Sequence, residues 1–82
     1  MLIPRSLKHL KITDTDRLYL TPLIKHWGVT SQAFRTAELS SEDIGKMYIL
    51  EAEGRARPML LDRLFARYST RIVEERRENE SS

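Results

Sequence analysis

Five polar residues between positions 30 and 36 have side chains that can contact nucleic acid. Hydroxyl groups bond phosphate oxygens and base edges, an amide can pair with adenine, and a guanidinium can pair with guanine. The five residues are Thr30, Ser31, Gln32, Arg35 and Thr36. They form a candidate contact set for a helix that reads DNA, and an ordinary solvated helix face is the alternative.

Four further basic residues can hold phosphates: Lys25, Arg63, Arg67 and Arg71. The three arginines are spaced four apart in the helix expected at the end of the chain, so they lie on one side of it. None has an acidic residue four positions before it, and Glu75 can pair only with Arg71. We therefore expect an arginine ridge that its own helix does not neutralise. A merely soluble face is the alternative.

Charge is unevenly distributed along the chain, although the formal net charge is only +2. Six basic residues outnumber two acidic ones over residues 1–36, and five arginines outnumber one aspartate over residues 55–72. Between these blocks, over residues 37–54, five acidic residues outnumber one lysine. Two basic blocks flank an acidic one, which fits either a binding footprint or solvated faces that happen to cluster.

The candidate contact set needs a scaffold, and residues 20–38 fit a helix-turn-helix. Pro22, preceded by a threonine, predicts the start of a first helix over residues 22–27, and Gly28 is expected to end it. A second short helix is predicted over residues 32–38, with Thr30 or Ser31 as its cap. The apolar residues expected to hold the two helices together are Leu23, Ile24, Trp27, Val29, Phe34 and Ala37.

The run at this turn reads Trp27, Gly28, Val29, Thr30, Ser31, Gln32, Ala33 and Phe34. It resembles the turn and the start of the recognition helix in small phage-type repressors of the Cro kind and in excisionase-like regulators. The resemblance covers under a quarter of the chain, and it implies a DNA-binding module whose second helix enters the major groove. The chain departs from the family pattern at Ile24, where alanine is usual, and at Pro22, which shortens the first helix.

Helix signals continue on both sides of this stretch. Thr13 and its neighbours offer cap oxygens for a short helix or turn. Ser40 stands three residues before Asp43, in the spacing of a capping box, and Gly54 is expected to end the helix that follows. A strand over residues 47–50 is the alternative within that helix.

The final helix is predicted to begin near Pro58 and to reach about Arg76. Its apolar stripe consists of Leu61, Leu64, Phe65, Tyr68 and Ile72. The stripe is expected to pack inside the chain's own core. The alternative is a homodimer seam through Leu61, Phe65, Tyr68 and Ile72, whose spacing also fits a heptad.

These patterns predict an all-α fold, a compact bundle of about four short helices that ends in a long amphipathic helix. Residues 1–12 fit neither a strand nor a helix cleanly, so a short N-terminal strand or arm is expected. We place a single small helical domain at residues 1–77, because a chain of 82 residues can bury only one core. Residues 78–82 are polar and acidic, and we expect them to be a disordered tail.

The sequence lacks the residue patterns of catalytic and metal sites. It has no cysteine, His9 and His26 lie far apart, and its three glycines form no phosphate loop. We therefore expect a non-enzyme without metal, cofactor or small-molecule substrate. The longest apolar run, residues 47–50, is too short to span a membrane, and the N-terminus is not laid out as a signal peptide, so we expect a cytoplasmic protein.

Two functions fit these expectations. The first is a small regulator that binds double-stranded DNA through the helix-turn-helix, supported by a basic face. The second is a protein-binding module, such as a small inhibitor or adaptor encoded by a phage or other mobile element. Such a module would use the arginine ridge or the acidic middle of the chain against a protein surface of opposite charge.

Overall fold

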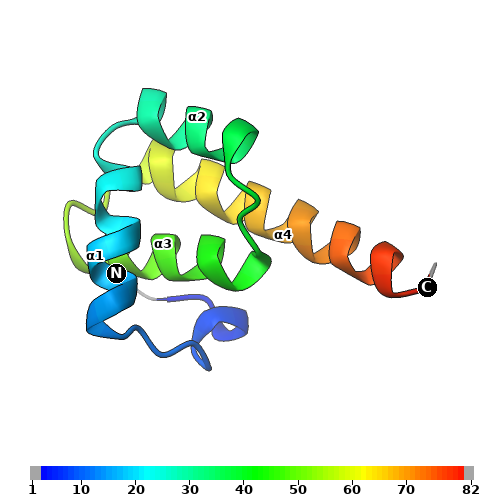
Figure 1. Cartoon of the computed structure of the whole chain (residues 1–82). Coiled ribbons are helices and arrows are strands. Elements are labelled where there is room, and N and C mark those ends of the chain that lie inside the picture. The colour runs from blue at the N-terminus through cyan, green and yellow to red at the C-terminus, as the bar shows by residue number, and fades with distance from the viewer. Residues whose placement is uncertain (1–2, 81–82) are drawn as a thin grey trace.

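The computed structural model describes residues 3–80, and within that range it contains helices and no strand (Figure 1). The elements are the 3₁₀ helices η1 Arg5–Leu7 and η2 Thr21–Ile24, and the α-helices α1 Asp14–Leu20, α2 Trp27–Thr36, α3 Ser41–Glu53 and α4 Pro58–Glu80. The predicted all-α fold is confirmed. Residues 47–50 are helical, so the alternative of a strand there is wrong.

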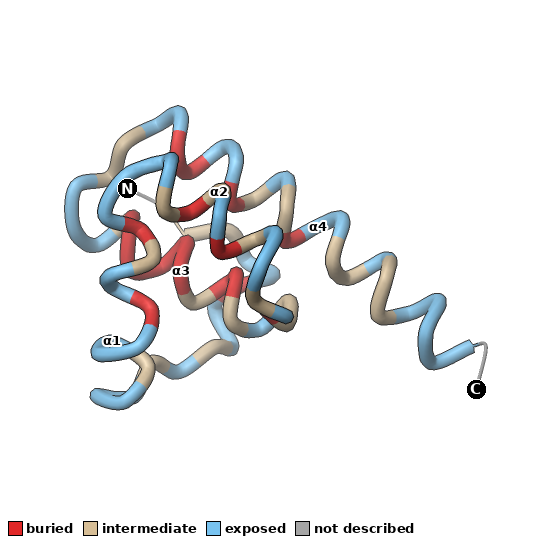
Figure 2. The backbone as a smooth tube through the Cα atoms, turned by 45° about the horizontal axis from the view of Figure 1, so that its top comes forward, coloured by how far each residue is buried: buried red, intermediate tan, exposed pale blue. Residues whose placement is uncertain are grey.

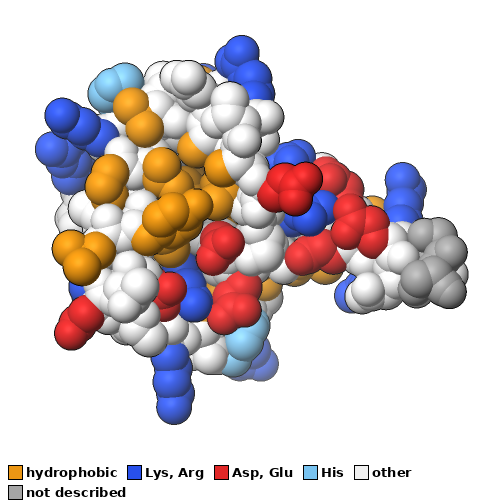
Figure 3. Space-filling model, viewed as in Figure 1, with side chains coloured by type: hydrophobic (Ala, Val, Ile, Leu, Met, Phe, Trp, Pro, Cys, Tyr) orange, Lys and Arg blue, Asp and Glu red, His pale blue; other side chains and the backbone are white. Residues whose placement is uncertain are grey.

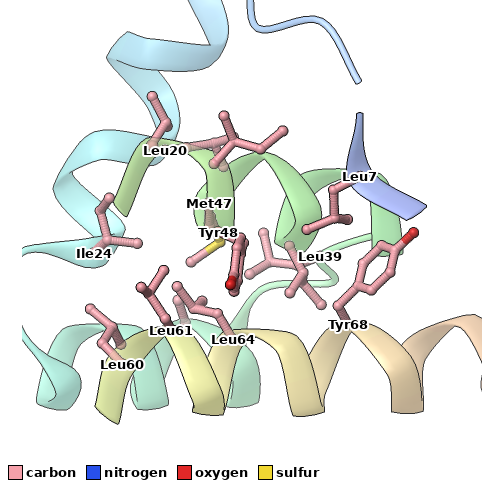
Figure 4. Close-up of a cluster of buried hydrophobic side chains, with 14 residues drawn as sticks. Leu7, Leu20, Ile24, Leu39, Met47, Tyr48, Leu60, Leu61, Leu64 and Tyr68 are labelled. Carbon is pink, nitrogen blue, oxygen red and sulfur yellow. The ribbon is translucent and has the colours of Figure 1, made fainter. Parts of the chain in front are cut away.

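Most of the core lies between α3 and α4, which run antiparallel as a hairpin (Figures 1 and 4). Ile44 and Met47 of α3 and Leu64 of α4 are almost completely buried there, and Leu20 closes the core from the end of α1. Burying a side chain of this size contributes about 1.5–3 kcal/mol relative to leaving it exposed. The hairpin therefore provides the rigid base on which the other elements rest.

The apolar stripe of α4 faces this core. Leu61 and Tyr68 are buried, while Phe65 and Ile72 are half-buried and pack against the same cluster. The ring of Phe65 meets that of Tyr48 edge-on, with the two ring centroids 5.9 Å apart. The stripe therefore packs inside the chain's own core as expected, and the homodimer seam through the same residues stays a prediction.

The last turns of α4 extend past the N-terminal end of α3 and are largely exposed (Figure 2). The helix continues to Glu80, beyond the predicted end near Arg76. Residues 78–80, which were expected to belong to a disordered tail, are helical, whereas residues 81–82 lie outside the described part. An ion pair between Arg71 and Glu78, 3.2 Å long, joins two turns of this extension.

Two helices begin at capping boxes, of which the sequence predicted the one at Ser40. The Ser40 hydroxyl accepts a hydrogen bond from the Asp43 N–H at 3.1 Å, and the Asp43 carboxylate accepts one from the Ser40 N–H at 3.4 Å. Thr13 and Asp16 form the same reciprocal pair at the start of α1. Each box satisfies backbone donors that the first turn of a helix leaves free.

Gly54 follows α3, as predicted, but the left-handed backbone conformation at this end falls on Ala56, with φ of 51°. Its N–H donates to the carbonyl of Glu51 at 2.6 Å. A residue with a Cβ pays a steric cost in this conformation, so the surrounding contacts must hold the α3–α4 loop in place.

The N-terminal segment is neither a strand nor a free arm in the part that the structure describes. Leu7 of η1 is fully buried, and the Tyr68 hydroxyl donates to the Ser6 carbonyl at 3.4 Å. The close approach depends on Gly45, because a Cβ there would lie 2.6 Å from a side-chain carbon of Leu10 and 2.9 Å from one of Leu7. The segment therefore packs down onto α3.

The turn before α2 lies upstream of the predicted position. The first helix ends at Ile24 instead of residue 27, and α2 already begins at Trp27, so Gly28 is inside a helix. The Nδ1 atom of His26 caps α2 by accepting a hydrogen bond from the Val29 N–H at 3.4 Å. A Cβ at Gly28 would lie 3.1 Å from the His26 ring, so this glycine makes room for the cap and forms no turn.

Candidate nucleic-acid interface

The outward face of α2 presents Gly28, Gln32 and Arg35, which are all exposed. Positions 28, 32 and 35 follow the four- and three-residue spacing of neighbours on one helix face. Ser31 is half-buried beside them, and its hydroxyl accepts a hydrogen bond from Nη2 of Arg35 at 3.0 Å. This contact holds the Arg35 side chain along the helix surface.

Thr30 does not belong to this face, so its predicted role in DNA contact is wrong. It is fully buried, and its hydroxyl donates to the Leu23 carbonyl at 2.6 Å and lies 3.2 Å from the carbonyl of His26. Because α2 starts before Thr30, this residue falls within the first turn, on the side that faces η2. It anchors the helix and does not cap it.

Thr36 is exposed at the end of α2, but its hydroxyl donates to the Gln32 carbonyl at 2.9 Å. The side-chain amide of Gln32 makes no hydrogen bond to another residue within the described range. Among the predicted base-reading residues, the structure thus brings Gln32 and Arg35 together as exposed side chains on one face.

The predicted arginine ridge is largely neutralised by its own helix. Arg67 pairs with Glu74 at 3.2 Å, and Arg71 pairs with Glu74 at 3.4 Å and with Glu78 at 3.2 Å. The ion pair with Glu78 raises the pKa of Arg71. The acidic partners lie three and seven residues after the arginines, on the next turns of the same face. The prediction of an unneutralised ridge considered mainly the position four residues before each arginine, and it was therefore wrong for these two.

Arg63 differs from the other two arginines. Its guanidinium lies over the ring of Trp27 at 4.3 Å from the centroid, and it has no acidic partner within residues 3–80. The Trp27 ring also meets Phe34 edge-on at 6.1 Å. Stacking on an aromatic face orients a guanidinium without removing its charge, so α4 presents a positioned cation beside the start of α2.

The 14 lysines and arginines, all of which lie in the described range, fall into three groups. Five are paired with acidic residues: Arg17, Lys46, Arg57, Arg67 and Arg71. Four cations around α2 form no ion pair within residues 3–80: Lys25, Arg35, Arg55 and Arg63. The remaining five also form no ion pair in that range, and they belong to the N-terminal segment and the last turns of α4: Arg5, Lys8, Lys11, Arg76 and Arg77. Arg55 was not among the predicted site residues. It lies in the α3–α4 loop and donates a hydrogen bond of 3.4 Å to the carbonyl of Lys25, a contact that arises only when the chain folds.

A buried ion pair ties the segment before α2 to the hairpin. Glu51 is only 2% exposed and accepts hydrogen bonds from the backbone N–H and the guanidinium of Arg57 at 2.9 to 3.0 Å. The same guanidinium donates to the carbonyls of Ile24 at 2.6 Å and Lys25 at 3.1 Å. Burial by itself would raise the pKa of Glu51, but the bonds from Arg57 outweigh it and hold the pKa below the usual 4.5.

An apolar patch lies between α1 and α2, on the side of α2 next to its outward face (Figure 3). Leu18 is 80% and Tyr19 56% exposed. Next to them is a shallow hollow of about 220 Å³, lined in part by Tyr19, Leu23, Val29 and Ala37. We call Leu18 and these four residues the apolar patch. Exposed apolar side chains in a contiguous group are typical of protein contact surfaces.

Within residues 3–80, histidine and carboxylate side chains do not gather in groups of three suitable for a metal ion. In the same range, each helix is too short or too polar to cross a lipid bilayer. Comparison of the chain with protein-family models, with characterised proteins and with solved structures finds no match.

Proposed function

We propose that this chain is a small non-enzymatic DNA-binding regulator that places α2 against the major groove. The observation that carries the proposal is the distribution of cations without acidic partners. The four cations grouped around α2 form no ion pair, whereas Arg17 of α1 and Lys46 of α3 are ion-paired. Unpaired cations also occur on the N-terminal segment and at the end of α4, so the support comes from the grouping of Lys25, Arg35, Arg55 and Arg63 beside one exposed helix. Free cations near one exposed helix are the electrostatic footprint expected for a polyanion.

The roles of the residues follow from their positions. Gln32 and Arg35 can reach base edges from the outward face. Lys25 stands just before the N-terminus of α2, where the helix dipole favours phosphate. Arg63, held on Trp27, supplies a second phosphate contact from α4.

Thr30 and the Glu51–Arg57 ion pair support this arrangement from inside. Thr30 fastens the first turn of α2 to η2, and Arg57 fastens the residues before α2 to the hairpin. A recognition surface whose contacts are held by the scaffold loses less conformational entropy on binding. The outward face can therefore be altered without disturbing the contacts that hold α2.

The test is the binding of purified protein to a mixed-sequence DNA duplex, measured by fluorescence anisotropy at several salt concentrations. Arg63→Ala should weaken binding and reduce the slope of log K against log salt by about 1, as expected for one lost phosphate contact. Arg76→Ala is the matched control, because Arg76 is an exposed arginine on the projecting end of α4. No binding at low salt, or equal effects of the two variants, would overturn the proposal.

Base reading is tested separately from phosphate contact. Gln32→Ala should leave the salt slope unchanged but reduce the discrimination between sites chosen by selection from random duplexes. A loss of discrimination of about fivefold or more is expected if the amide makes a bidentate contact with a base, since such contacts are worth about 1–3 kcal/mol. An unchanged preference would show that Gln32 is not a reading residue.

The apolar patch favours protein binding as a second candidate function. Leu18 and Tyr19 expose more apolar surface than a solvated helix face needs, and the shallow hollow beside them can receive an apolar side chain. Leu18→Ser with Tyr19→Ser should abolish capture of a protein partner, whereas Met59→Ser, at an equally apolar and 67% exposed position on α4, should not. Retained capture by the double variant would exclude the patch.

A further inference from the structure

A second hollow, of about 380 Å³, lies between η2, the end of α3 and the α3–α4 loop. Figure 1 shows the loop running beside the α1–η2 segment, and the hydrogen bond from Arg57 to the Ile24 carbonyl joins the two. Pro22, Ile24 and Leu50 give the hollow an apolar lining. Its volume falls within the range of small-molecule sites, roughly 300–1,000 Å³.

Positively charged side chains outnumber carboxylates in this hollow. The buried carboxylate of Glu51 is matched by the guanidinium of Arg57, which donates to both of its oxygens. Lys25 and Arg55 also line the hollow, and neither has an acidic partner within residues 3–80. An apolar interior thus adjoins two exposed cations, Lys25 and Arg55, that form no ion pair in the described range.

We propose that this hollow binds a small carboxylate with an apolar body. The apolar body would lie against Ile24 and Leu50, and the carboxylate would accept charge-assisted hydrogen bonds from Lys25 and Arg55. A strongly hydrated anion without an apolar part, such as inorganic phosphate, would gain nothing from the lining. The site goes beyond DNA binding and does not depend on it. It would hold a ligand that the chain does not transform.

The walls of the site are held in position before any ligand arrives. Arg57 bonds the carbonyls of Ile24 and Lys25, and the loop keeps Ala56 in a left-handed conformation that costs free energy. A site that is already formed loses little entropy on binding, so a ligand of about ten heavy atoms can bind measurably.

The experiment is an NMR titration of the isotopically labelled chain, without DNA, with sodium octanoate and with phenylacetate. Saturable shifts are expected at the methyl groups of Ile24 and Leu50 and at the Arg55 amide, with a dissociation constant of about 1 mM or lower. Octanoate has an aliphatic body and phenylacetate an aromatic one, and both carry a carboxylate. Saturable binding of either acid supports the site. Octanol and inorganic phosphate should bind at least about fivefold more weakly.

Two variants locate the binding. Arg55→Gln should weaken octanoate binding about fivefold or more, and Thr21→Trp should block the hollow from its exposed edge. Arg63→Gln is the control, since it removes the same charge from α4 outside the hollow. The proposal is overturned if no saturable shift appears up to about 20 mM, if octanol binds as tightly as octanoate, or if Arg63→Gln weakens binding as much as Arg55→Gln.

Discussion

The α3–α4 hairpin and α2 are held in the molecule by different kinds of contact. The hairpin buries large apolar side chains such as Met47 and Leu64 and encloses the carboxylate of Glu51. α2 buries only Thr30 and Ala33, and it meets α4 through aromatic rings beneath guanidinium groups. The two parts of the molecule therefore differ in how much apolar surface they bury and in how much polar surface they expose. The hairpin carries most of the free energy of folding, and α2 is free to carry exposed polar residues.

The largest effect is expected where the hairpin holds the segment before α2. Glu51→Gln removes one partner of a buried ion pair and leaves the Arg57 charge without a counterion, so the free energy of unfolding should fall by about 3 kcal/mol. Urea denaturation measures this change in the free energy of unfolding. The matched control is Glu53→Gln, because the Arg17–Glu53 pair is half-exposed and 3.5 Å long and should contribute less than about 1 kcal/mol. Equal losses would refute the contrast between buried and exposed pairs.

A smaller effect is expected at the anchor of α2. Thr30→Val keeps the shape of the side chain but leaves the Leu23 carbonyl without its hydroxyl donor, which should cost about 1–2 kcal/mol. Hydrogen exchange should quicken in α2 more than in α3 or α4. Thr36→Val, which removes an exposed hydroxyl from the same helix, should change stability by less than about 0.5 kcal/mol. Uniformly faster exchange would mean that α2 and the hairpin unfold together.

The two helix caps sharpen the same contrast. Ser40→Ala removes one half of the capping box of α3 and should lower the free energy of unfolding by about 1 kcal/mol. His26→Ala removes a single bond of 3.4 Å at the exposed start of α2 and should cost less than about 0.5 kcal/mol. Thermal denaturation compares them, and an equal or larger effect at His26 would contradict the weaker anchoring of α2.

The smallest expected effect is a loss of stability at acidic pH. A backbone hydrogen bond from Thr13 and an ion pair with Lys46 lower the pKa of Asp16 below its usual 3.8. A carboxyl whose pKa is lowered by folding stabilises the fold above that usual value and loses the contribution as the pH falls through its folded pKa. The urea midpoint should therefore fall between about pH 5 and about pH 3, and it should fall less in Asp16→Asn. Identical acid sensitivity would exclude Asp16.

Local sequence rules predicted the helices best where their signals lie within one turn. The Ser40–Asp43 box and the apolar stripe of α4 need only residues three or four apart, and both appear in the structure. The predicted start of α2 was wrong because Gly28 is compatible with either a turn or a helix. Contact with the His26 ring decided between them.

Only part of the candidate interface could be predicted from the sequence, because some of its residues are positioned by contacts between different elements. Gln32 and Arg35 lie on the exposed face as expected, but the burial of Thr30 depends on η2 and the pairing of Arg67 depends on a glutamate two turns further on. Arg55 joins the interface only because the α3–α4 loop folds back toward Lys25. Sequence spacing carries no information about the contacts of Thr30 and Arg55, which join different elements. The Arg67–Glu74 pair lies within one helix, and its spacing of two turns could have indicated it.

The amino-acid sequence by itself determined the helical class of the protein, its main caps and the inward face of α4. Those features follow from backbone hydrogen bonding and apolar spacing within short segments. Only the tertiary structure decided which charges remain free. An ion pair such as Glu51–Arg57 forms across a loop, and its strength depends on burial, which a residue acquires only when distant segments pack around it.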